Sequence, residues 1–243
     1  MMKKLTVAID GPAGAGKSSA ARLAAGNVHY LYIDTGAMYR AITWAILQHH
    51  VDIQDERAVG SFIQPLSIRL EPLADTCRVY VNDTEVTEEI RTQEISFHVS
   101  SVAALAVVRQ KLVQLQRDMA KQGGVILDGR DIGTVVLPDA DIKIFLTASV
   151  HSRAKRRYLE MQAKGSTETL EEIENSIAQR DYQDSHRAVS PLKQADDAML
   201  LDNSELNLEE TADVITKLIR QKAQREHLHI KSSVGYLISL PTH

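Results

Sequence analysis

A glycine-rich stretch near the N-terminus limits the folds open to this chain more than any other feature. Residues 11–18 read GPAGAGKS, which fits the phosphate-binding pattern of Gly, any four residues, Gly-Lys, and then Ser or Thr. The apolar run Leu5–Ile9 precedes it, and a helix-compatible run, Ser19–Ala24, follows it. A phosphate-binding loop needs a strand before it and a helix after it, and both flanks fit. The stretch therefore predicts an α/β fold that binds a nucleotide.

The residue types in this stretch suit the phosphates of a nucleoside triphosphate. Glycines let the backbone wrap an anion with its N–H groups pointing inward, and the start of the helix adds a positive dipole end. Lys17 would reach the β- and γ-phosphates, and the Ser18 hydroxyl would bind Mg²⁺. The simpler alternative is a turn that only joins a strand to a helix. Even as a phosphate site, the stretch does not separate a kinase from a GTPase or a motor ATPase.

The overall composition is that of an ordinary globular protein, with 44% hydrophobic and 25% charged residues. Its formal net charge of −4 gives no basic field to attract nucleic acid or an anionic membrane. Cys77 is the only cysteine, so we expect no disulfide within the chain, a reducing cytoplasmic location and an inert thiol rather than a nucleophile. The first apolar run stops at Asp10, too short for a secretion signal, and no run is long enough to span a membrane.

Short apolar runs alternate with helical patterns over most of the chain, which is typical of a parallel sheet buried on both faces. The runs expected to form strands are Leu5–Ile9, Tyr30–Ile33, Val125–Leu127, Ile142–Leu146 and Ala198–Leu201. Several are followed by Asp, Gly or Thr, and ligands bind at the carboxyl ends of strands in such sheets. Leu208–Leu218 is a helix candidate, with acidic residues early and basic residues late.

One segment breaks this alternation with antiparallel strand patterns. Residues 67–70 and 78–81 alternate apolar and polar side chains, and Asn82–Thr84 predicts a turn into 85–87. We therefore expect a small antiparallel sheet within an insertion at 62–122, between the second and third core strands.

A second segment, about 150–187, is rich in Arg and Glu and poor in large apolar residues. It is either a solvated helical surface or a lid whose arginines close on phosphates, and composition does not decide between them. The kinase-like core would comprise 1–61 and 123–226. From 227 to 243 the helical pattern does not continue, so we expect a frayed tail or one that packs on a neighbouring copy.

Two further motifs follow predicted strands. In Asp34–Arg40 (DTGAMYR), Thr35 offers a hydroxyl and Arg40 can bind a phosphate with its forked guanidinium, although a capped helix start explains the same residues. In Asp128–Thr134 (DGRDIGT), the aspartate at the strand end can hold Mg²⁺ through water. The alternative there is a plain salt-bridged loop.

A third motif, Arg180–Arg187 (RDYQDSHR), lies in the Arg-rich segment. Its two terminal arginines are seven residues apart and share one face of a continuous helix, so both could point into one site with Asp184. We assign no role to His186.

Together these stretches resemble the bacterial cytidylate kinases. The matching segments are IDGPAGAGKSS, YIDTGAMYRA, EEIRTQEIS, VVRQKLVQLQR, LDGRDIGTVVLPDADIKIFLTAS and RDYQDSHRAVSPL, in this order and spacing. The resemblance runs from about Leu5 to about Arg220, leaves the tail from His227 outside, and departs at Ser19, where many members carry Thr. It implies the P-loop nucleoside monophosphate kinase fold: a five-stranded parallel sheet flanked by helices, an inserted antiparallel β-containing monophosphate-binding region, and a lid.

The resemblance also implies a reaction, transfer of the γ-phosphoryl group of ATP to CMP or dCMP with Mg²⁺, by a monomer. It places the ATP phosphates on Gly11, Pro12, Ala13, Gly14, Ala15, Gly16, Lys17, Ser18 and Ser19, with Ser18 on the metal. It assigns to the monophosphate site Thr35, Arg40, Ser100, Arg109, Arg130, Asp131, Arg180, Asp184 and Arg187. The residues expected to stabilise the transferring phosphoryl group are Lys17, Arg130 and a lid arginine. The candidates for the lid arginine are Arg153, Arg156 and Arg157.

Physical chemistry agrees with this assignment. Asp131 or Ser100 would accept a hydrogen bond from the cytosine amino group, and Arg109 would donate to the acceptor edge of the base. Uracil would place a carbonyl against Asp131, and two acceptors facing each other would disfavour it. A kinase for UMP or dTMP is the alternative within this class. The acceptor phosphate, with a second pKa of about 6, is largely dianionic and needs no general base. A P-loop switch without transferase activity is the alternative from another class.

Overall fold

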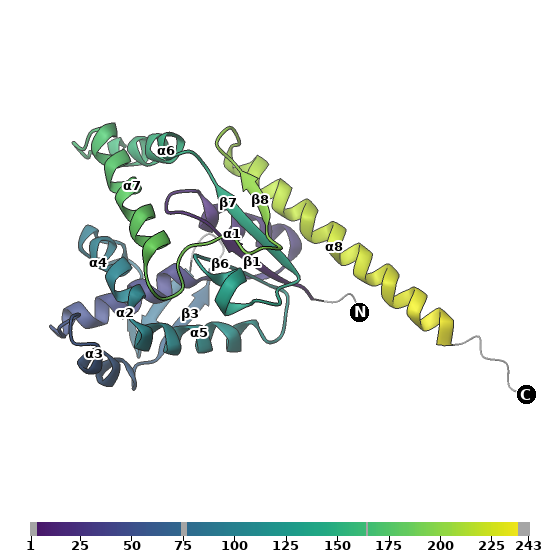
Figure 1. Ribbon diagram of the computed structural model, residues 1–243, viewed down its shortest axis with the longest axis horizontal. Coiled ribbons are helices and arrows are strands. Elements are labelled where there is room, and N and C mark those ends of the chain that lie inside the picture. Colours follow the sequence, from purple (N-terminus) through teal and green to yellow (C-terminus); the bar gives the residue numbers. More distant parts are fainter. Residues whose placement is uncertain (1–3, 74–76, 164, 238–243) are drawn as a thin grey trace, which may run out of the picture.

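The computed structural model describes residues 4–73, 77–163 and 165–237 (Figure 1). A parallel sheet of five strands, in the order β2-β6-β1-β7-β8, forms its centre. The strands are β1 (Thr6–Asp10), β2 (Leu31–Asp34), β6 (Val125–Gly129), β7 (Ile142–Thr147) and β8 (Met199–Asp202). Each of the five apolar runs forms one of them and extends one or two residues further toward its carboxyl end. The predicted α/β fold with a five-stranded parallel sheet is therefore confirmed.

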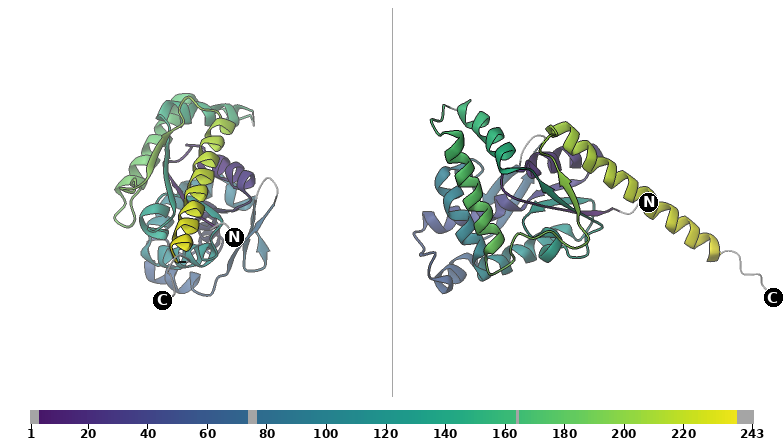
Figure 2. Two further views of the ribbon diagram at one scale, coloured as in Figure 1. Left: turned by 90° about the vertical axis from the view of Figure 1, so that its right-hand side faces the viewer. Right: turned by 45° about the horizontal axis from the view of Figure 1, so that its top comes forward.

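Helices cover both faces of the sheet because its strands are apolar on both sides. On β1, Val7 and Ile9 pack with α1 (Lys17–Val28) and α8 (Leu208–Leu237), whereas Ala8 faces the opposite layer. That layer holds α2 (Thr35–Gln48) and α5 (Ala106–Ala120). The two layers can be followed in Figure 2. This stacking leaves the carboxyl ends of β1, β2 and β6 together at one edge of the sheet, where the predicted motifs lie.

The predicted antiparallel sheet is present between the second and third core strands. Its strands β3 (Ile68–Pro72), β4 (Cys77–Val81) and β5 (Thr84–Glu85) pair in that order, and Asn82 takes a positive φ of 52° in the turn. The helical elements of this region are α3 (Glu56–Ile63), the 3₁₀ turn η1 (Glu89–Arg91) and α4 (Gln93–Ala104). Ile68 and Val79 join the same apolar cluster as α2, so the inserted sheet is packed onto that face.

The Arg-rich segment forms two packed helices, α6 (Val150–Gln162) and α7 (Leu170–His186). Ala154, Ile173 and Ile177 form a small apolar cluster between them. Thr169 and Glu172 cap the start of α7 reciprocally. The pair therefore has a core of its own and is more than a solvated surface.

The C-terminal region differs from the prediction, because α8 does not stop near residue 226. It continues to Leu237, and Figure 1 shows its distal part extending beyond the body of the protein. No Gly or Pro interrupts residues 208–234, and an established helix adds one backbone hydrogen bond per residue. The remainder of the predicted tail, 238–243, lies outside the described residues. Within the described ranges, no helix has both the length and the apolar character that crossing a membrane requires.

Candidate active site

The loop after β1 has the close backbone contacts that its glycines predict. A Cβ on Gly11 would lie 1.9 Å from the carbonyl oxygen of Leu146, so only glycine fits there. Gly16 caps α1 with a left-handed φ of 80°. Asn203, which follows β8, donates from Nδ2 to the carbonyl of Ala15 (3.0 Å) and holds the far side of the loop. The loop is thus fixed by two neighbouring strands, β7 and β8.

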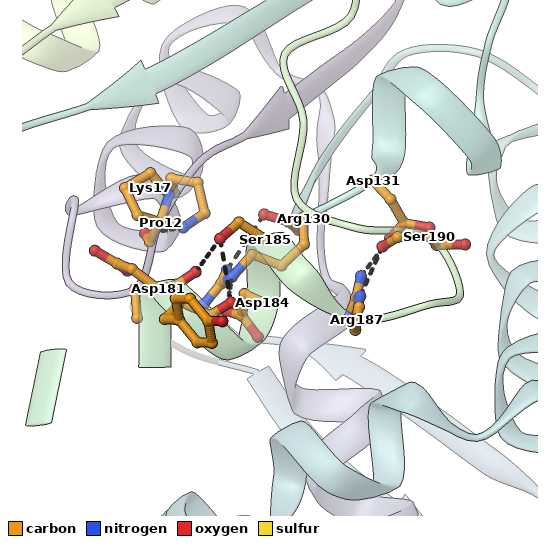
Figure 3. Close-up of polar contacts among 12 residues, drawn as sticks. Pro12, Lys17, Arg130, Asp131, Asp181, Asp184, Ser185, Arg187 and Ser190 are labelled. Carbon is orange, nitrogen blue, oxygen red and sulfur yellow. Dashed lines mark hydrogen bonds and ion pairs between the residues drawn. The ribbon is translucent and has the colours of Figure 1, made fainter. Parts of the chain in front are cut away.

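Lys17 is buried inside this loop. Its Nζ donates to the carbonyl of Pro12 at 2.8 Å (Figure 3). Burial, together with the nearby guanidinium groups of Arg130 and Arg180, lowers the pKa of Lys17 to about 7, although Asp128 and Asp10 oppose this shift. Two guanidinium groups near a buried amine favour an anionic ligand at this position.

Ser18 lies next to an acidic side chain at the end of β6. The Ser18 hydroxyl donates to Asp128 Oδ2 (2.8 Å), and the Tyr32 hydroxyl donates to Asp128 Oδ1 (2.7 Å). Burial raises the pKa of the Asp128 carboxyl. A hydroxyl and a carboxylate side by side are oxygen ligands of the type Mg²⁺ prefers, so these residues fit the expected metal. In the described ranges no group of three or more His, Cys, Asp or Glu offers another metal site.

The residues expected to read a base come together from three distant segments. Arg109 of α5 forms a buried ion pair with Asp131, which follows β6. Arg187, at the end of α7, places Nη2 3.8 Å from the other oxygen of Asp131. The Arg109 guanidinium also lies 5.5 Å from the centre of the Tyr39 ring. The structure thus brings together Arg109 and Asp131, two of the residues expected to read the base, and adds Arg187, which the sequence analysis assigned to the monophosphate site.

Arg130, which follows β6, and Arg180, on α7, add further cationic groups near Lys17. Arg130 donates from Nε to Asp184 at 2.8 Å, as Figure 3 shows. Two buried donor atoms, Arg180 Nε and Arg187 Nη2, have no hydrogen-bond partner among the described residues. Burial and the proximity of Arg130 lower the pKa of Arg180 to about 10. Buried guanidinium donors without a hydrogen bond are costly, so these positions are suited to a ligand that supplies acceptors, such as a phosphate.

Comparison with known proteins gives the same result as this geometry. A sequence model of the family described as cytidylate kinase matches residues 7–221. The cytidylate kinase of Lactobacillus johnsonii is 52% identical over 218 residues, covering 90% of this chain and 95% of that protein. The cytidylate kinase of Bacillus subtilis is 50% identical over 224 residues, covering 92% of this chain and all of that protein. The chain belongs to the cytidylate kinase family.

Membership in the cytidylate kinase family confirms the resemblance inferred from the motifs and the expected class of enzyme, a kinase that phosphorylates CMP and dCMP. It removes the switch without transferase activity as an alternative. Similarity to solved structures is more distant. A shikimate kinase from Bacteroides thetaiotaomicron gives a TM-score of 0.47 at 12% identity, covering 90% of this chain and 99% of that chain.

The motif after β2 serves two purposes in this member of the cytidylate kinase family. Asp34 caps α2 by accepting from the N–H of Ala37 (2.7 Å) and also pairs with Arg40 (3.1 Å). The Thr35 hydroxyl donates to the carbonyl of Asp128 (2.6 Å) and so links β2 to β6. The helix-cap interpretation is therefore confirmed, and Arg40, which is partly exposed, can still take the phosphate-binding role expected of it. Ser100, on α4, is partly buried.

The lid arginines expected from the cytidylate kinase resemblance have different environments. Arg153 is buried, donates from Nη1 to the carbonyl of Ala13 (2.8 Å) and pairs with Asp181 (2.6 Å). Arg156 donates from Nη2 to the carbonyl of Asn203 (2.5 Å). Arg157 is exposed. In this conformation the first two guanidinium groups are bound to the protein itself, whereas Arg157 remains accessible.

Sequence reasoning missed two residues that hold the site together, Asn203 and Asp181. Asn203 directly follows β8, so the rule that ligands gather at strand carboxyl ends could have found it. Asp181 lies within the motif already singled out, between Arg180 and Asp184, but no sequence signal names Arg153 as its partner.

Cys77 has the environment of an inert thiol. Burial raises the pKa of the Cys77 thiol to about 11, so little thiolate, the reactive form, is present at pH 8. We expect iodoacetamide to modify Cys77 about 100-fold more slowly in the folded protein than in urea, as measured by mass spectrometry. Equal rates in the two conditions would contradict this expectation.

Proposed function

We propose that residues 11–19 bind the phosphates of ATP and that the residues between β6 and α7 bind CMP or dCMP. The observation that carries this proposal is the pair of buried guanidinium donors without hydrogen-bond partners, Nε of Arg180, which lies near Lys17 and Arg130, and Nη2 of Arg187, which lies near Asp131. A nucleotide switch needs a phosphate site for the triphosphate alone. Arg130, Arg180 and Arg187 lie outside the loop that binds the triphosphate. They are suited to a second, phosphorylated substrate.

Selection of the base rests on the buried ion pair between Asp131 and Arg109. Asp131 accepts a hydrogen bond from the cytosine amino group, with Ser100 as a further acceptor, while Arg109 donates to N3 and O2. The Asp131 carboxylate is held in place by Arg109 and faces Arg187. Uracil presents a carbonyl at this position, and two acceptors would face each other.

The other polar residues hold the ribose and the acceptor phosphate. Arg40, Arg130 and Arg187 neutralise the phosphate, and Arg180 and Asp184 contact the sugar. Thr35 shapes this end of the site through its bond to the Asp128 carbonyl. Arg130 can turn all of its guanidinium donors toward the phosphate only after its Nε leaves Asp184.

Transfer needs no general base, because the acceptor phosphate is already ionised. The protein contributes alignment of the two substrates and stabilisation of charge on the transferring group. Lys17 and Arg130 are placed for this stabilisation. Arg157 is the accessible lid arginine. Arg153 either leaves Ala13 and Asp181 to stabilise the transferring group or stays in its present position and holds the phosphate-binding loop.

Mg²⁺ is the proposed cofactor. Ser18 would bind it directly and Asp128 through water, and when bound it neutralises charge on the phosphates of ATP. Ser18 would then leave its hydrogen bond to Asp128, while Tyr32 keeps that carboxylate oriented.

The domain division stays as proposed from the sequence, with a core of 1–61 and 123–226, a lid at about 150–187, a monophosphate-binding insertion at 62–122, and a tail at 227–243 outside the family pattern. Arg109 and Ser100 both come from the insertion, which supports its role in binding the monophosphate. We also propose a cytoplasmic monomer that needs neither nucleic acid nor membrane.

A substrate panel tests this function. ADP release by purified protein is measured with ATP-Mg²⁺ and each of CMP, dCMP, UMP, dTMP and AMP. We expect CMP and dCMP to be used at least about 100-fold more efficiently than UMP or dTMP, because a buried acceptor rejects an analogue that lacks the matching donor. A preference for UMP or dTMP would overturn the roles given to Asp131 and Arg109.

A further inference from the structure

Asp10 is a buried carboxylate that the proposed function does not use. It is the last residue of β1, directly before the loop that binds phosphate, and it is 4% exposed. Its side chain binds the segment that follows β6. Oδ1 accepts from the N–H of Ile132 and Oδ2 accepts from the N–H of Gly133, both at 2.7 Å. Burial raises the pKa of the Asp10 carboxyl to about 6, so at neutral pH it is ionised and both oxygens are acceptors.

The two amides belong to the turn η2 (Ile132–Val136), whose capping residue is Asp131. The carbonyl of Asp131 accepts from Val135 (2.9 Å) and Val136 (3.1 Å), but its side chain makes no capping bond. A capping aspartate ordinarily accepts with its own carboxylate from the N–H of the second or third residue of the turn. Here Asp10 has taken the N–H of the second residue, Gly133, together with that of the first, Ile132.

We propose that Asp10 caps this turn in place of Asp131 and thereby leaves the Asp131 carboxylate free to pair with Arg109 and to read the base. Asp10 is then a positioning residue for the acceptor site, although it adjoins the donor loop in sequence. This inference rests on the proposed base-reading role of Asp131.

The isosteric variant Asp10→Asn tests the proposal. Its oxygen can accept from one of the two amides, while its NH₂ group faces the other N–H, so Asp131 is drawn back toward the turn. We expect kcat/KM for CMP to fall about 10- to 100-fold, the size of losing a hydrogen bond to a charged group, and the preference for CMP over UMP to narrow. KM for ATP should change less than about 3-fold. If KM for ATP rose by the same factor by which kcat/KM for CMP fell, Asp10 would instead support the phosphate loop, and the proposal would be overturned.

Asp141→Asn is the matched control. Asp141 Oδ2 likewise accepts from β1, taking the N–H (2.8 Å) and hydroxyl (3.1 Å) of Thr6, at the opposite end of the strand. Its variant should lose comparable stability and keep the CMP-to-UMP preference. Loss of that preference in Asp141→Asn as well would reduce the Asp10 effect to general destabilisation and overturn the proposal.

Asp131→Asn and the double variant separate this inference from the function on which it rests. If Asp131→Asn keeps the base preference, the base-reading role of Asp131 fails. If Asp131→Asn loses the preference and Asp10→Asn keeps it, only the capping proposal fails. We expect the double variant to be no less selective than Asp131→Asn alone, because both changes act on one carboxylate.

A measurement on the unaltered protein covers the case in which Asp10→Asn does not fold. Hydrogen exchange followed by NMR should show slow exchange of the Ile132 and Gly133 amides with and without CMP, because the cap exists before the substrate binds. Fast exchange of both amides in the free protein would overturn the proposal.

Discussion

The Lys17→Ala variant is expected to lose turnover by about 100- to 1,000-fold or more while its fold stays intact, because it removes a buried cation from the transferring phosphate. The fold is preserved because the amine is buried and lies near other cations, and burial together with those cations lowers its pKa to about 7. Removing that amine relieves repulsion from Arg130 and Arg180 rather than breaking an ion pair. Initial rates at saturating ATP and CMP give the loss, and thermal unfolding reports the stability.

A second lysine provides the control. Lys111 on α5 also donates its Nζ to a backbone carbonyl, that of Gln64 (3.0 Å), but lies outside the site. Lys111→Ala should keep turnover within about 2-fold of the unaltered protein, as expected for a surface substitution. Near-normal turnover in Lys17→Ala would refute the placement of Lys17 on the transferring phosphate.

The parts of the fold that sequence predicted correctly are set by short-range patterns. An apolar run bounded by polar residues identifies a buried strand, and the glycine pattern after β1 specifies a loop whose backbone approaches Leu146. The polar motifs after β2 and β6 were predicted to meet because parallel strands bring their carboxyl ends to one edge. The extension of α8 was missed, since β-branched residues after 227 lowered the helical pattern without interrupting the backbone.

The pairing of side chains within the site could not be predicted in the same way. Asp10 and Ile132 are 122 residues apart, and several other carboxylates could have taken that amide. Arg153 and Asp181 likewise come from different helices, and only the packing of α6 on α7 decides that they meet. Sequence supplies the chemical types at each strand end, whereas three-dimensional packing decides which acceptor each donor finds.

The Asp131→Ala variant is expected to lower kcat/KM for CMP about 100-fold while KM for ATP changes less than about 3-fold. Asp131 is the buried acceptor for the cytosine amino group, and a missing partner for a polar substrate group costs several kcal/mol. The change also leaves Arg109 buried without its ion-pair partner, so the free energy of unfolding should fall by about 3–5 kcal/mol. Rates are therefore measured at a temperature where the variant is fully folded.

Asp131→Asn separates selectivity from stability in this experiment. Its amide keeps the volume and one acceptor, and its N–H groups can donate to the carbonyl that uracil presents. The ratio of kcat/KM for CMP to that for UMP should therefore narrow more in Asp131→Asn than in Asp131→Ala, which offers uracil no new donor. Equal losses toward CMP and ATP in both variants would mean that Asp131 supports the fold or the metal and does not read the base.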